Sequence, residues 1–112
     1  MEDLYDFAKA EFALDKRPKD SKATNREHLT AIWQQTGVKP VELDNVPPSS
    51  AVHYLLDIFY RLSIARQMGM ATNPILYSEI LAWSNLTEWR LSQWEIDVIK
   101  QLDLIWLNTQ NE

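Results

Sequence analysis

The sequence contains no cysteine, which excludes disulfide bridges, thiolate zinc sites and cysteine nucleophiles and favours a reducing compartment. Only two glycines occur in 112 residues, too few for a glycine-rich loop that cradles phosphate. No apolar run approaches the length of about 18 residues that a membrane span needs. The first residues, Met1-Glu2-Asp3, are acidic, unlike the apolar segment of a secretory signal. We therefore expect a small soluble domain with no membrane partner.

The balance of charge argues against nucleic acid as a partner. Acidic residues outnumber basic ones and give a formal net charge of −5 at pH 7, which repels phosphate backbones. Basic residues gather in the segment 15–26, but no aromatic side chain lies there to stack on bases. The segment 92–107 has the length of a recognition helix, yet its acidic residues exceed its basic ones.

The residue types that carry catalysis or bind metals are sparse. His28 and His53 are the only histidines, and His53 lies one helical turn before Asp57. Such a pair would supply two ligands, whereas zinc sites need three or four from the protein. We interpret these as surface histidines near carboxylates. With no nucleophile motif either, we predict no metal, no cofactor and no enzymatic activity.

The apolar residues recur at spacings of three and four, which is typical of amphipathic helices. Prolines and glycines separate these stretches. The pattern predicts an all-α fold, a small bundle of four main helices plus an N-terminal helix. The expected helices span residues 3–14, 25–36, 50–68, 74–84 and 92–107.

Helix ends are marked by known capping patterns. Thr24 with Glu27 and Ser92 with Glu95 are capping boxes. Asn73-Pro74 offers a cap followed by proline at the first helical position. Gly37 and Gly69 stand where helices end.

The apolar stripes predict the core. The expected buried side chains are Leu4, Phe7, Ala8 and Phe12, then Leu29, Ile32 and Trp33, then Val52, Leu55, Leu56, Phe59, Leu62 and Ile64, then Ile75, Leu76, Ile80, Leu81 and Trp83, and finally Trp94, Val98, Ile99, Leu102 and Ile105. We interpret Asp97, Lys100 and Asp103 as ordinary charge pairing on a helix surface.

The chain divides at its basic segment. Residues 15–26 contain five of the 11 basic residues and Pro18, a composition typical of a solvated connector. We expect residues 1–20 to form a mobile N-terminal helix and linker that packs only weakly. Residues 21–112 then form the helical domain.

Tryptophan is the most unusual feature of the composition. Five occur, four of them in the last 30 residues. Trp83 and Trp94 lie on apolar stripes and are predicted to be core. Trp89 falls in a turn, and Trp106 lies near the chain end, where aromatic side chains can anchor an interface. We predict a partner-binding surface of Trp89, Arg90, Trp106 and Leu107, whose tryptophans can be truncated with little effect on melting temperature. The residues alone thus favour a protein-binding module.

A resemblance to a known family sharpens this reading. Residues 24–107 resemble phage tail assembly chaperones, small proteins encoded next to the tape-measure protein. The matching segments are Thr36-Gly37-Val38-Lys39-Pro40, Pro47-Pro48, Gly69-Met70, Asn73-Pro74-Ile75, Tyr77-Ser78-Glu79-Ile80, Ala82-Trp83, Leu86-Thr87, Arg90-Leu91, Trp94-Glu95, Ile99 and Leu102-Asp103. Glu88 stands where similar proteins have glycine, and Trp89 stands where they have a small or variable residue.

The resemblance implies a non-enzymatic protein of the host bacterial cytoplasm. It implies binding to the tape-measure protein and the tail-tube protein, and self-association is a further expectation. The alternative from another class is a small phage-encoded regulator or inhibitor that binds a host protein or nucleic acid. A gene position between the tube and tape-measure genes favours the first hypothesis, and a position among early genes favours the second.

Overall fold

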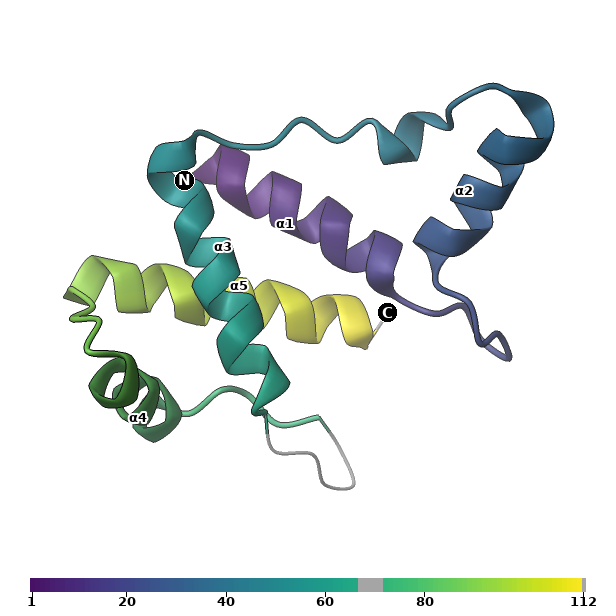
Figure 1. The fold of residues 1–112 in the computed structure, drawn as a ribbon. Helices are drawn as coiled ribbons and strands as arrows, with labels where there is room; N and C mark the ends of the chain where they lie inside the picture. The colour runs from purple at the N-terminus through teal and green to yellow at the C-terminus, as the bar shows by residue number, and fades with distance from the viewer. Residues whose placement is uncertain (67–71, 112) are drawn as a thin grey trace.

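The computed structural model describes residues 1–66 and 72–111. Its elements are α1 (Glu2–Asp15), α2 (Asn25–Thr36), the short 3-10 helix η1 (Val41–Leu43), α3 (Ser50–Ile64), α4 (Tyr77–Thr87) and α5 (Gln93–Gln110). The described residues contain no β-strand, so the predicted all-α class is confirmed. Figure 1 shows α1, α3 and α5 crossing one another, while α2 and α4 lie at opposite sides of this body.

The core forms where α1, α3 and α5 meet. The buried apolar side chains are Leu4, Phe7, Ala8 and Phe12 of α1, Leu55, Leu56, Ile58, Phe59 and Leu62 of α3, Ile75 of the segment before α4, Ile80 of α4, and Val98, Ile99 and Leu102 of α5. Burial of these side chains is the main force that stabilises the fold. Most of the predicted core on α1, α3 and α5 is confirmed.

The N-terminal helix belongs to this core, so the prediction that it packs only weakly is wrong. Leu4 and Ala8 are fully buried, and the Phe12 ring lies 5.4 Å from the Phe59 ring of α3. The Lys16 Nζ donates a hydrogen bond of 2.8 Å to the Thr109 carbonyl near the end of α5. The apolar stripe of α1 therefore meets partner helices along its whole length. The mobility of residues 1–20 and the boundary at residue 21 stay predictions.

Helix α2 begins and ends as predicted but buries nothing. Both halves of the Thr24–Glu27 capping box are present, and Gly37 adopts the left-handed conformation with φ 74°. None of its residues is buried, and Trp33 is 41% exposed. The prediction that Leu29, Ile32 and Trp33 form a buried face is wrong, because α1 and η1 are the elements of the described chain that pack most against this helix, and they leave most of its surface open.

The connection from α3 to α4 differs from the prediction at both ends. Helix α3 ends at Ile64, which is 87% exposed and not core. The predicted end at Met68 and Gly69 lies outside the described residues. Helix α4 begins at Tyr77 with Leu76 as its N-cap, so the predicted start at Asn73-Pro74 is wrong.

The backbone of Ile75 is bound to α5, which explains the late start of α4. The Ile75 N–H donates to an Asp103 carboxylate oxygen at 2.9 Å, and the Lys100 ammonium donates to the Ile75 carbonyl. These contacts hold the Ile75 backbone against α5, and Lys100 engages the carbonyl that would accept a backbone N–H if Ile75 were helical. Leu76 and Leu81, both predicted to be core, are exposed.

Two predictions on α5 are wrong. Trp94 is 49% exposed, because the first turn of α5 extends past the body. Asp103 is only 1% exposed, so it is no surface charge. Its carboxylate lies 2.6 Å from the Arg66 guanidinium, and both side chains are almost completely buried. Ile105 and Trp106 are half-buried and pack against the core.

Candidate partner-binding surfaces

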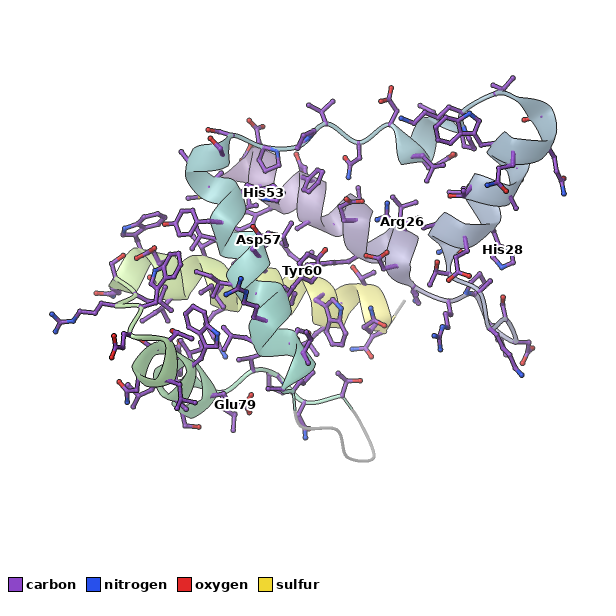
Figure 2. All side chains as sticks on the ribbon, in the orientation of Figure 1. Arg26, His28, His53, Asp57, Tyr60 and Glu79 are labelled. Carbon is purple, nitrogen blue, oxygen red and sulfur yellow. The ribbon has the colours of Figure 1, made fainter. Side chains whose placement is uncertain are left out.

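The described residues contain no cluster suited to metal binding. The His53 Nδ1 lies 3.6 Å from an Asp57 oxygen at the surface of α3, and His28 lies far from both on α2 (Figure 2). No group of three or more potential ligands comes together in the part of the chain described. The His28 ring contacts the Ser21 hydroxyl at 3.0 Å, and that hydroxyl also bonds the Ala23 backbone. This arrangement stabilises a turn.

The predicted binding residues fall into two separate places. Trp89 and Arg90 lie in the turn between α4 and α5, and both are exposed. Trp106 and Leu107 lie in the last turns of α5 and are half-buried. The length of helix between the two pairs corresponds to about 20 Å at 1.5 Å per residue. The four residues therefore do not form one continuous surface, and their role in binding stays a prediction.

Trp89 belongs to a cluster of three aromatic side chains from α3, α4 and the turn after α4. We call it the Trp89 cluster (Tyr54, Trp83 and Trp89). The Trp89 ring stacks on Tyr54 with centroids 6.1 Å apart and planes 14° apart. It also contacts the Trp83 ring at 6.2 Å. Trp89 remains 43% exposed, so the cluster presents an aromatic face to solvent. Tyr54 could not be predicted as part of this cluster from the sequence, because its stacking on Trp89 is a tertiary contact between α3 and the turn.

A hydrogen bond fixes this cluster to the start of α5. The Tyr54 hydroxyl donates to a Glu95 carboxylate oxygen at 2.6 Å. Burial, together with the Glu95 charge, raises the pKa of Tyr54 to about 12. Burial opposes ionisation of Glu95, but hydrogen bonds from the Ser92 N–H, the Tyr54 hydroxyl and the Ser92 hydroxyl lower its pKa. The donor thus stays protonated and the acceptor stays charged at neutral pH.

Trp106 has a different environment from Trp89. The Arg66 guanidinium lies over its ring at 4.1 Å from the centroid, a cation–π contact. Arg66 also donates to the Asn73 carbonyl at 2.9 Å and pairs with Asp103. Trp106 therefore covers a buried ion pair, which is a structural role.

A third surface, which we call the α1–α2 groove, was not predicted from the sequence. It is a cavity of about 630 Å³ open to solvent, lined by Ala10, Ala13, Leu14, Pro18, Asn25, His28, Leu29 and Glu42. Its walls come from α1, α2 and η1, and Arg26 holds the two helices together (Figure 2). The Arg26 guanidinium contacts Glu11 at 2.7 Å and Asp15 at 3.0 Å. Three separate segments form the groove, so no single stretch of sequence predicts it.

Comparison with known proteins identifies one relationship. A family model described as phage tail assembly chaperone matches residues 32–108, which is more than half of the chain. No curated protein and no solved structure matches the chain. Among the described residues, no helix is both long and apolar enough to span a membrane. The matched region runs from the middle of α2 almost to the end of α5, and it includes the Trp89 cluster.

Proposed function

Because this chain belongs to the phage tail assembly chaperone family, we propose that it acts in tail morphogenesis by binding the tape-measure protein, the tail-tube protein or both. The family match is the observation that carries this proposal. The family also suggests a non-catalytic role. The proposed place of action is the cytoplasm of the host bacterium, where tails are assembled.

The exposed apolar surface supports a binding role. The exposed side chains Ile32 and Trp33 of α2, the Trp89 cluster and the α1–α2 groove each leave apolar surface in contact with water, and such surfaces mark sites of interaction. A tape-measure protein is expected to be a long helical chain with apolar stripes that aggregate when uncovered. A small protein with several modest apolar surfaces suits transient cover, because no single contact has to be tight.

Co-expression tests the proposal directly. The tape-measure and tail-tube proteins of the same phage are each produced with and without this chain, and the soluble fraction and co-purification are measured. We expect the chain to raise the soluble fraction of at least one of them and to co-purify with it. If both stay insoluble and neither is captured, the proposal is wrong. Capture of a host protein or nucleic acid in place of both would favour the regulator hypothesis.

Substitutions of the predicted contact residues Trp89 and Trp106 distinguish a binding role from a structural one. Trp89→Ala removes an exposed ring, so we expect weaker capture of the tail protein with little change in the soluble yield of the chain itself. Trp106→Ala removes a ring that packs on Arg66 and the core, so we expect a stability loss of about 2 kcal/mol, measured by urea denaturation. Equal stability losses for both variants would show that Trp89 is also structural.

A further inference from the structure

The α1–α2 groove combines small apolar walls with open access. Ala10 and Ala13 of α1 face Leu29 of α2 across it, with Leu14 and Pro18 among the other lining residues. Short side chains such as alanine allow another helix to approach closely, at interaxial distances of about 8–10 Å. The described residues offer no sheet edge to which an extended peptide could add. An open groove with alanine along one wall therefore suits a helix as its occupant.

The charges beside this groove differ from those of the whole molecule. The segment from Asp15 to His28 holds five of the 11 basic residues but only three of the 16 acidic ones, although the chain has a net charge of −5. Arg17 and Lys19 flank the lining residue Pro18, and both are exposed. Neither takes part in an ion pair within the part of the chain that the structure describes.

From these observations we infer that the α1–α2 groove binds an amphipathic helix whose polar flank is acidic at the end near Pro18. The apolar stripe of that helix fills the space between Ala13 and Leu29, and its carboxylates approach Arg17 and Lys19. Glu42 lines the groove as well and disfavours acidic residues beside it. The bound helix is thus acidic only on the part of its flank near Pro18. This uneven charge determines which way the helix runs along the groove.

This inference rests on the proposed function, since the helix would belong to the client tail protein, but it can fail separately. The probes are two synthetic 18-residue helical peptides with the same leucine stripe. One carries glutamate on the flank, and its twin carries lysine at those positions. Binding is measured by fluorescence anisotropy at low and at high salt. We expect the glutamate peptide to bind about tenfold more tightly than the lysine twin at low salt, and salt to reduce the difference.

Charge reversal assigns the site. Arg17→Glu with Lys19→Glu alters two exposed side chains, so the fold is retained, and we expect the preference to switch to the lysine peptide. The matched control is Lys9→Glu with Arg61→Glu, which changes the same net charge at exposed positions outside the groove and should keep the original preference. An equal effect of both pairs would overturn the inference, because only the overall charge would then matter.

The second test of the site fills the groove with a larger side chain. Ala13→Phe should abolish binding of the glutamate peptide, whereas Ala82→Phe at an exposed position of α4 should not, and circular dichroism confirms the helix content of both. Unchanged peptide binding by Ala13→Phe overturns the inference. If that variant still solubilises the tail protein in co-expression, the proposed function stands and only this site is wrong. Failure of the unmodified chain to solubilise any tail protein contradicts the proposed function instead.

Discussion

The buried pair of Arg66 and Asp103 is the residue-scale feature with the largest energetic consequence. Their charged groups are 2.6 Å apart, and both side chains are 2% exposed. Removing one partner leaves an uncompensated charge away from water, which costs about 3–5 kcal/mol. Asp103 also accepts the Ile75 N–H, so the same carboxylate fixes the segment that leads into α4.

We therefore predict that Arg66→Met lowers the free energy of unfolding by about 3 kcal/mol, measured by urea denaturation. Asp103→Asn should cost a similar amount, because the Arg66 guanidinium then lacks its counter-charge. The double variant removes both charges while the amide oxygen can still accept the Ile75 N–H. We expect it to lose less than the sum of the single losses. Strictly additive losses would show that the two groups do not interact.

At the scale of elements, the end of α4 carries backbone strain. Glu88 adopts the left-handed conformation with φ 59°, and the Trp89 N–H donates to the Ser84 carbonyl at 3.1 Å. The Glu88 N–H donates to the same carbonyl, and the left-handed position at such a helix end favours glycine. Glu88 therefore holds a turn geometry that suits its side chain less well than it would suit glycine.

The strain at Glu88 gives a second prediction. Glu88→Gly should raise the free energy of unfolding by about 1 kcal/mol, since a side chain in the left-handed region costs about 1–2 kcal/mol. Asn85→Gly, in the exposed helical part of α4, is the control and should lower stability by about 0.5–1 kcal/mol. Thermal melting of both variants measures the difference. A Glu88→Gly variant no more stable than the parent would contradict the argument.

The start of α5 gives a pH-dependent prediction. The pKa of Glu95 is lowered from its ordinary value of 4.5, so this group stabilises the fold above that value, and its contribution is lost as the pH falls through the folded-state pKa. Glu95→Gln should therefore be less stable than the parent at pH 7 by about 1 kcal/mol. The stabilities of the two proteins should approach each other as the pH falls through the lowered folded-state pKa of Glu95. Denaturation curves across this range test it, and a difference that grows at acid pH would contradict it.

The presence of each helix and most of the capping residues could be predicted from the sequence, because they depend on the spacing of residues close together in the chain. All five α-helices and both capping boxes are present. Features that depend on contacts between residues far apart in the sequence could not be predicted. The start of α4 is set by Asp103 and Lys100 from α5. The environment of Trp106 could not be predicted for the same reason, because its ring packs against Arg66, from another segment. Asp103 lies four residues after Ile99 on the buried stripe, and this position was the one available sign of its burial.

At the scale of the whole molecule, the fold is more extended than its length requires. The radius of gyration of the Cα atoms is 15.6 Å, whereas a compact domain of this length has about 13 Å. Figure 1 shows the cause, since α2 and the chain that follows it extend away from the crossing of α1, α3 and α5. Because α2 buries no residue, its apolar stripe provides little stabilisation in the isolated chain. That surface remains available to a partner.

Helix α2 should therefore open more readily than the body, and Arg26 should control how often it does. A helix of 12 residues is marginal in water by itself, and the Arg26 contacts to Glu11 and Asp15 hold α2 against α1. Partly exposed ion pairs contribute about 1 kcal/mol or less. Arg26→Ala should then increase hydrogen exchange of the α2 amides about fivefold, while the α5 amides stay protected. The control Arg17→Ala removes an exposed cation with no ion pair among the described residues. It should change the hydrogen exchange of neither the α2 nor the α5 amides. Equal exchange of α2 in all three proteins would show that contacts other than this ion pair hold the helix in place.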